Sequence, residues 1–150
     1  MNSFSLYPFL QNVPAVRSLA DKVSTALFVS GTTEPARYVS YSSAELPNDF
    51  VVTVLGTTFT AKLEYFKFIA NSREYLAGQF YFFEMVNGEE RRLETILRML
   101  APSDVILPDG THMDAADLDL RTGMVTIMRD KLSTALLTEQ VGKMGSWSFD

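Results

Sequence analysis

The feature that most constrains the fold of this sequence is a pair of long segments, 57–70 and 75–86, rich in aromatic and β-branched residues. Such residues favour β-strands, and the polar stretch 71–74 between the segments favours a turn. We therefore expect the two segments to pair as an antiparallel hairpin in which Ala70 lies opposite Tyr75. Half of the aromatic residues of the chain lie in this hairpin, so it is expected to form the centre of the fold.

This pairing sorts the side chains of the hairpin onto two faces, because side chains alternate along a strand. One face is predicted to be core, with Lys67 as its main exception. Its apolar residues are Phe59, Leu63, Tyr65, Ile69, Leu76, Phe80, Phe82 and Val86. The second face is mixed, polar toward one end and aromatic elsewhere. It holds Thr58, Thr60, Lys62, Glu64, Phe66, Phe68, Ala77, Gln79, Tyr81, Phe83 and Met85.

The second face needs a cover, because a sheet face in contact with water does not normally present so many aromatic side chains together. The cover is a helix of the same chain, a partner subunit, or a small apolar ligand held in a cupped sheet. We take this face as the candidate partner- or ligand-binding surface. Its proposed binding residues are Phe66, Phe68, Tyr81, Phe83, Met85, Lys62, Glu64 and Gln79. The assignment depends on the register, since a slip of one residue would exchange the faces of one strand.

Two helices are predicted, one near each end of the chain. The first begins near 12–14, where an asparagine and an early proline suit a helix N-terminus, and it stops at Gly31. Its apolar stripe is Val16, Leu19, Ala20, Val23, Ala26 and Leu27. The last helix is predicted over about 129–144. Segments 21–28 and 130–137 match at six of eight positions, which is either coincidence or a sign that both helices use an equivalent face.

The remaining segments are predicted to be mostly short strands. Runs 36–42 and 50–55 have strand character, and 104–107 with 111–113 suits a small hairpin around a Pro-Asp-Gly turn. A second small hairpin is expected over 118–128. Segment 88–100 is ambiguous: the spacing of its leucines favours a helix, which we prefer, while a strand also fits part of it.

These elements predict a single α+β domain over residues 1–150. The expected architecture is an antiparallel β-meander with an N-terminal and a C-terminal helix packed on the sheet. The hydrophobic content of 47% is sufficient for a packed core.

Composition limits the functions that such a domain can have. The net charge of −5 argues against a nucleic-acid-binding surface, which is normally basic. The absence of cysteine excludes disulfides, thiolate metal sites and thiol nucleophiles, and it fits a reducing compartment. No export signal is evident, and uncharged runs are too short to span a bilayer. We therefore expect an intracellular (cytoplasmic) protein, or one incorporated into a large assembly such as a virion, without nucleic-acid or membrane partners.

The sequence offers little catalytic chemistry. His112 is the only histidine, and the chain lacks the Gly-x-Ser-x-Gly pattern, phosphate-binding glycine loops and the calcium-loop pattern. An acidic stretch without basic residues follows at Asp104, Asp109, Asp114, Asp117 and Asp119. These aspartates are expected to form turns and helix caps, with a cation site or a surface for a basic partner as alternatives. We expect no catalytic residue, no metal, no cofactor and no enzymatic activity.

The function predicted from these observations is a non-enzymatic assembly or protein-interaction subunit. It is expected to be oligomeric, either self-associating or bound to a protein partner, and to belong to a viral or other large complex. Ordered C-terminal aromatic residues, Trp147 and Phe149, are expected to be buried, against the body of the chain or a neighbour. The alternative is a small-molecule-binding domain, or a minor enzyme, that uses the cupped aromatic face.

Overall fold

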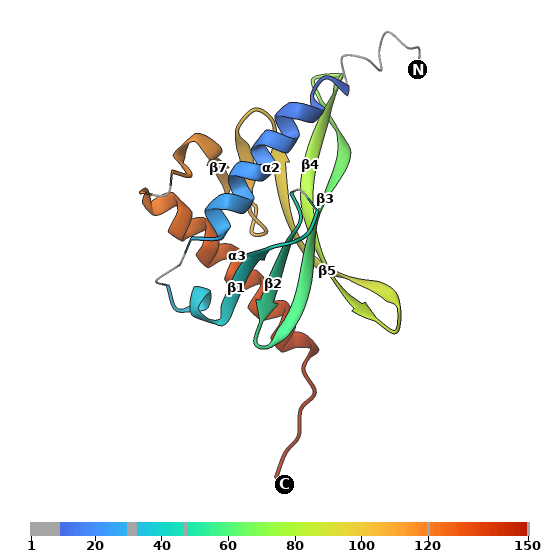
Figure 1. Cartoon of the computed structure of the whole chain (residues 1–150), viewed down its shortest axis with the longest axis vertical. Coiled ribbons are helices and arrows are strands. Elements are labelled where there is room, and N and C mark those ends of the chain that lie inside the picture. The colour runs from blue at the N-terminus through green and yellow to red at the C-terminus, as the bar shows by residue number, and fades with distance from the viewer. Residues whose placement is uncertain (1–9, 30–32, 47, 120, 150) are drawn as a thin grey trace.

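The protein is an α+β domain in which a curled seven-stranded antiparallel sheet carries two helices on one face (Figure 1). The structure is a computed structural model that describes residues 10–29, 33–46, 48–119 and 121–149. The predicted β-meander with an N-terminal and a C-terminal helix is confirmed. Gly31, the predicted end of the first helix, lies outside the described residues, and the helix itself ends at Leu27.

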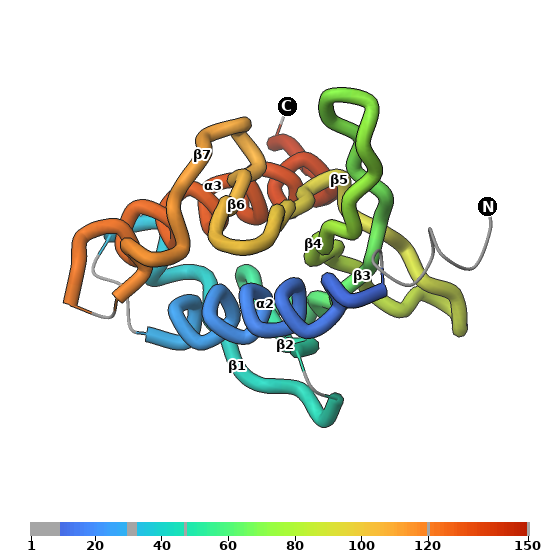
Figure 2. Tube along the Cα trace, turned by 90° about the horizontal axis from the view of Figure 1, so that it is seen from above, coloured from blue at the N-terminus to red at the C-terminus, as the bar shows by residue number. Residues whose placement is uncertain are grey.

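The strands lie in the sheet in the same order as in the sequence. They are α2 (Val13–Leu27), η1 (Pro35–Tyr38), β1 (Val39–Ser43), β2 (Phe50–Val54), β3 (Thr57–Ala70), β4 (Arg73–Val86), β5 (Glu89–Leu100), β6 (Asp104–Ile106), β7 (His112–Asp114), η2 (Ala115–Asp117) and α3 (Gly123–Lys143). Each strand pairs with the next along the chain, from β1 to β7. Seen from above, the strands curl around the two helices (Figure 2).

Tight turns set the registers of the long strands. The connections β2–β3, β3–β4 and β4–β5 each contain two residues with positive φ, which suits the twist of a β-hairpin. The β3–β4 turn is two residues long instead of the predicted four, so Ala70 pairs with Arg73 and not with Tyr75. The shift is two residues, an even number, and both faces of the hairpin therefore keep the side chains predicted for them.

Segment 88–100 is strand β5, so the predicted helix is wrong. Its buried side chains are Leu93, Thr95, Leu97 and Met99, which alternate as in a strand that is buried on one face. The Asn-Gly turn before β5 directs the chain back along the open edge of β4, whose backbone groups need partners. The hydrogen bonds of this long-range pairing therefore determine the conformation of the segment, and the helical spacing of its leucines does not.

Two further assignments need correction. The predicted hairpin over 118–128 is wrong, because α3 already begins at Gly123. Val125 and Met128 lie on the buried stripe that Leu132 and Leu136 continue, so the helical period extends farther upstream than predicted. The predicted strand over 36–42 is shorter, since residues 35–38 form the helical turn η1. The small hairpin of β6 and β7 is confirmed.

The core lies between the concave face of the sheet and the two helices. All six residues of the predicted apolar stripe of α2 are buried. Phe50 packs edge-to-face on Phe80 and Phe82, with ring centroids 4.9 and 6.1 Å apart. The repeated segments occupy α2 and α3, and their aligned residues Val23 and Leu132 are both buried in this one cluster. The two helices therefore use an equivalent face against the same sheet.

A bulge bends the sheet where β4 and β5 separate from the helix layer. Tyr81 lies opposite Ile96 and Phe83 opposite Arg92, so three residues of β5 face the single residue Phe82 of β4. The insertion is two residues long, and the alternation of side chains therefore continues through it. Beyond the bulge, the two strands form an arm that projects from the body (Figure 1).

The carboxylate of Glu139 on α3 holds this bulge in place. It accepts hydrogen bonds from the backbone N–H groups of Glu94, at 2.6 Å, and Thr95, at 3.0 Å, as well as from the Thr95 hydroxyl. Strand β6 pairs with β5 only from Arg98 onward. Glu139 thus binds donors along the part of β5 that β6 does not pair with, and covering an edge in this way limits pairing with other chains.

Helix α2 lies unusually close to β4 at Gly78. A Cβ atom added at Gly78 would lie 2.6 Å from Cγ1 of Val16 and 3.2 Å from Cδ1 of Leu63. A glycine inside a strand marks such a close approach. The contact therefore fixes the position of α2 on the sheet, and any larger residue at 78 would push the helix outward.

We predict that Gly78→Ala lowers the free energy of unfolding by about 1–3 kcal/mol, the usual cost of overpacking a core. Val16→Ala should relieve the clash, so the double variant should be less destabilised than the sum of the two single variants. Urea denaturation of the four proteins measures this coupling.

Gly142→Ala on α3 is the matched control, because a Cβ atom there meets nothing within 4 Å. It should leave stability unchanged or raise it by up to about 1 kcal/mol, as expected for a helical glycine. A neutral Gly78→Ala, or strictly additive effects at 78 and 16, would contradict the close approach.

Candidate functional site

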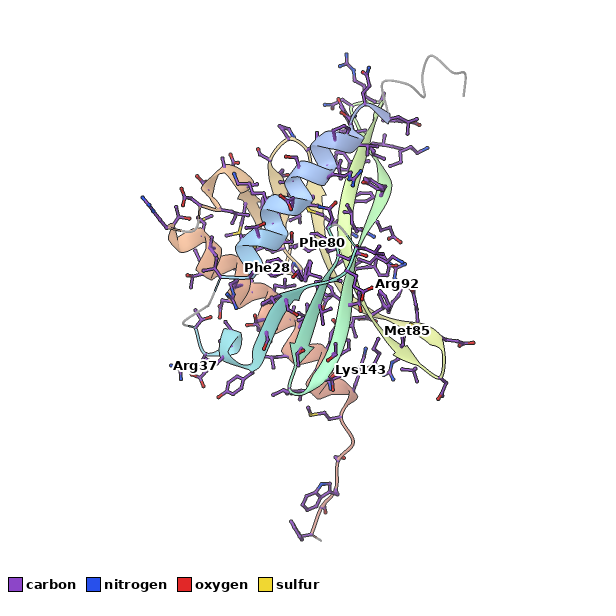
Figure 3. All side chains as sticks on the ribbon, in the orientation of Figure 1. Phe28, Arg37, Phe80, Met85, Arg92 and Lys143 are labelled. Atoms are coloured by element: carbon purple, nitrogen blue, oxygen red, sulfur yellow. The ribbon has the colours of Figure 1, made fainter. Side chains whose placement is uncertain are left out.

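The structure brings the predicted binding residues together on the face of the sheet opposite the helices. The register places Lys62 beside Tyr81 and Glu64 beside Gln79. Phe66 and Phe68 continue along β3 toward the hairpin tip, and Met85 lies on the projecting β4–β5 arm (Figure 3). The side chains form one continuous strip, but their exposure differs greatly along it.

The middle of this strip is covered by the chain itself. Tyr81 and Phe83 are each only 8% exposed, and their ring centroids lie 5.7 Å apart. The guanidinium of Arg92, on β5, lies over the Tyr81 ring at 3.9 Å from its centroid. The cover at Tyr81 therefore includes a side chain of the neighbouring strand, which was not among the three covers considered from the sequence.

The polar residues of the strip bind one another. Glu64 accepts hydrogen bonds from Gln79 at 2.7 Å and from Arg92 at 3.1 Å. Burial alone would raise the pKa of Glu64, but the hydrogen bonds from Arg92 and Gln79 outweigh it and lower the pKa below its usual value. Glu64 is thus kept ionised and holds Arg92 over Tyr81. These groups serve the sheet itself and do not converge on an empty site.

Apolar exposure is concentrated instead at the end of the β3–β4 hairpin. Tyr65 and Ile69 were predicted to be core, yet they are 41% and 62% exposed. They lie on the predicted face, beyond the part of the sheet on which α2 packs, since α2 begins at Val13. Tyr75, on the other face of the hairpin, is also exposed. Among the described residues, both faces of this hairpin end therefore carry exposed apolar side chains.

A groove of about 380 Å³ lies at this hairpin end, and we refer to it as the hairpin-end groove. Three parts of the chain form it: the hairpin itself, the residue before α2, and the link between β5 and β6. Its lining residues are Asn12, Phe68, Ala70, Tyr75, Leu76, Leu100, Ala101, Pro102, Ser103 and Asp104. Among the predicted binding residues, Phe68 lines this groove.

The groove is chemically suited to an apolar or aromatic side chain. Phe68, Tyr75 and Leu100 supply its apolar walls, and Asp104 is its single charged residue. The ion pair between Lys67 and Glu74, at 3.3 Å, lies on the same hairpin and is open to solvent. An apolar pocket with a polar border is typical of the anchor sites of protein interfaces.

The sequence analysis did not identify the groove as a unit. Phe68 was found because it is an aromatic residue on the second face, but Leu100 and Pro102 lie more than thirty positions away. Their juxtaposition depends on β5 pairing with β4, and segment 88–100 was predicted to be a helix. The strand alternative for that segment would have brought the residues after Leu100 beside the hairpin.

A second, more polar cavity of about 440 Å³ lies between α3 and β5. Its lining includes Glu94, Thr95, Arg98, Thr138 and Glu139. The Glu139 carboxylate is already bound by the backbone of β5. This cavity therefore surrounds a contact that stabilises the fold.

The acidic stretch forms turns and caps, as predicted. Asp109, Asp114 and Asp119 each accept a hydrogen bond from the backbone N–H two residues ahead. A hydrogen bond from Lys131 lowers the pKa of Asp109 to about 2. His112 Nδ1 lies 3.1 Å from the Asp104 carboxylate, and both side chains are open to solvent. Across the part of the chain that the structure describes, no three acidic or histidine side chains converge to hold a metal ion.

Arg129 is a buried cation on α3 with unsatisfied hydrogen-bonding groups. Its side chain is only 5% exposed, and neither Nε nor Nη1 has a hydrogen-bond acceptor among the described residues. Its nearest aromatic contact is the Tyr41 ring, whose centroid lies 5.2 Å away. Burial lowers the pKa of Arg129 and raises the pKa of Tyr41 to about 12. The Tyr41 hydroxyl lies 3.0 Å from the Ser133 hydroxyl, one helical turn from Arg129.

No helix within the described ranges combines the length and apolar character needed to cross a membrane. Comparisons with protein-family models, curated proteins and solved structures found no match. The function must therefore be argued from the surfaces and sites of this chain alone.

We predict that Arg129→Met raises the free energy of unfolding by about 1–4 kcal/mol, because it replaces an unpaired buried charge by an apolar side chain of similar length. Urea denaturation measures the change. Arg17→Met is the control: Arg17 is exposed on α2, and its replacement should change stability by less than about 0.5 kcal/mol. A clear loss of stability in Arg129→Met would show that Arg129 makes a stabilising contact beyond those described above.

Proposed function

We propose that the protein is a non-enzymatic protein-interaction subunit of a larger assembly, and that the hairpin-end groove binds an apolar segment of its protein partner. One observation carries the proposal: the end of the β3–β4 hairpin presents an apolar groove with exposed aromatic neighbours. Such an arrangement is costly to leave in water and is typical of binding surfaces.

The composition of the hairpin end supports a protein partner. Tyrosine and phenylalanine are enriched at the centres of protein interfaces, where they fill or line pockets. Phe68 and Tyr75 line the groove, while Tyr65 and Ile69 extend the apolar surface around the hairpin. A partner that inserts one side chain into the groove can therefore pack further apolar groups against the hairpin.

The size of the groove indicates how the interface must be built. One aromatic side chain buries about 150–250 Å². A stable interface buries about 800 Å² on each partner, so the groove alone would supply only an anchor. Tyr65, Ile69 and Tyr75 are exposed on the same hairpin and offer additional apolar surface beside the groove.

We predict that Phe68→Ser weakens partner association at least tenfold, because it removes one wall of the groove. The protein should be purified from its source cells, and stoichiometric partners identified by mass spectrometry and its assembly mass by light scattering. The wild type should carry a stoichiometric protein partner or exceed the monomer mass of 16.8 kDa.

Phe66→Ser is the matched control. Phe66 lies two residues from Phe68 on the same face of β3 and is likewise half-buried, but it does not line the groove. Thermal melts should show similar losses of stability for the two variants, while Phe66→Ser keeps the association. A wild type that stays a monomer without a stoichiometric partner even at about 1 mM, or equal binding by Phe68→Ser and the wild type, would overturn the proposal.

A further inference from the structure

Building on the proposed function, we infer that the hairpin-end groove binds the C-terminal tail of a second copy of this chain, with Trp147 as the inserted side chain. The tail is defined here as residues 144–149. The partner is then another copy of the chain. One end of each molecule contacts the opposite end of the next.

The tail carries the most exposed large apolar side chains of the described residues. Helix α3 ends at Lys143, and the chain continues in an extended conformation at Met144. Trp147 is 80% exposed and Phe149 is 93% exposed, with their rings packed edge-to-face at 4.9 Å between centroids. The burial expected for these two residues from the sequence is thus absent within a single copy. Figure 1 shows the tail projecting from the body.

The tail cannot reach the groove of its own molecule. Gln140, near the end of α3, donates a hydrogen bond to the Thr57 hydroxyl at 2.9 Å, which places the start of the tail beside the first residue of β3. Phe68 lies eleven residues farther along β3, a distance of about 36 Å for an extended strand. The stretch from Met144 to Trp147 spans only about 10 Å. In Figure 1 the tail and the hairpin tip lie at opposite ends of the molecule.

The chemistry of the two ends is complementary. The tail from Met144 to Phe149 is uncharged, and its two aromatic rings match the apolar walls formed by Phe68 and Tyr75. The single charged residue that lines the groove is Asp104. In the sequence the tail lies between Lys143 and Asp150, so the favoured orientation brings Lys143 toward Asp104 and keeps Asp150 away from it. Opposite charges beside an apolar contact favour the correct orientation of the partners.

The proposed contact joins two different surfaces, so it does not close into a twofold dimer. A pair of copies still has an unoccupied groove at one end and an uninserted Trp147 at the other, and repetition produces chains or rings. The two aromatic side chains of the tail bury about 300–500 Å² together. This is less than the surface of a stable interface, so isolated copies should associate weakly and depend strongly on concentration.

Sedimentation velocity over a range of concentrations tests the inference with two complementary variants. The tail variant carries Trp147→Ser and Phe149→Ser, and the groove variant carries Phe68→Ser. The wild type should form species larger than a dimer as its concentration approaches about 1 mM. Each variant alone should remain at the monomer mass of 16.8 kDa.

An equimolar mixture of the two variants is the decisive sample. The tail variant keeps an intact groove, and the groove variant keeps an intact tail, so the mixture should form a one-to-one dimer and nothing larger. The control Phe66→Ser should associate like the wild type. A wild type that stays monomeric, a tail variant that self-associates normally, or a mixture that stays monomeric would overturn the inference.

The outcome also separates this inference from the proposed function. If the protein from source cells holds a partner that Phe68→Ser loses and the tail variant keeps, another protein occupies the groove, and the inference fails while the proposed function stands. If both variants keep every partner and the assembly mass, the groove binds no protein and both fail.

Discussion

The contact between Val16 and Gly78 determines where the helix layer lies on the sheet. The absence of a side chain at Gly78 lets α2 settle directly on β4, and the close packing of Val16 there leaves no freedom to shift along the strand. From this position α2 covers the middle of the sheet and begins at Val13. Strands β3 and β4 extend past the part of the sheet on which α2 packs. In the part of the chain that the structure describes, apolar side chains stay exposed at this hairpin end, where the groove lies.

Two other parts of the sheet are covered by side chains of the same chain. Arg92, held by Glu64, lies over Tyr81 in the middle of the second face. Glu139 binds the backbone donors of β5 at the bulge. Within the described ranges, the hairpin-end groove and the C-terminal tail are left open, and they lie at opposite ends of the molecule. An open apolar feature at each end is the geometry that the proposed head-to-tail association requires.

Much of the fold could be predicted from the sequence because its strongest signals are local. The stripe of α2 follows the helical period, and the faces of the β3–β4 hairpin follow strict alternation. The predicted faces are correct although the predicted turn length is wrong, because the register differs from the predicted one by an even number of residues. Segment 88–100 could not be assigned locally, because its leucines fit two periods and the decision came from the open edge of β4.

The candidate site was predictable only in part, for the same physical reason. Phe68 and Tyr81 belong to one predicted face. Whether a side chain distant in the sequence covers either of them cannot be predicted from the face alone. Arg92 reaches Tyr81 through the β4–β5 pairing, and Leu100 reaches Phe68 through the same pairing. Because segment 88–100 was predicted to be a helix, neither the contact of Arg92 with Tyr81 nor the position of Leu100 in the groove could be predicted.

The proposed contact between the groove of one copy and the tail of another can be located with a paramagnetic label. The chain has no cysteine, so Ser146→Cys gives a unique attachment site for a nitroxide beside Trp147. Labelled protein is mixed with a second, ¹⁵N-labelled copy, and amide signals of the second copy are recorded by NMR. The account predicts selective broadening at Phe68, Leu100 and Ser103. Association without broadening at these amides, or with broadening centred on another surface, would contradict it.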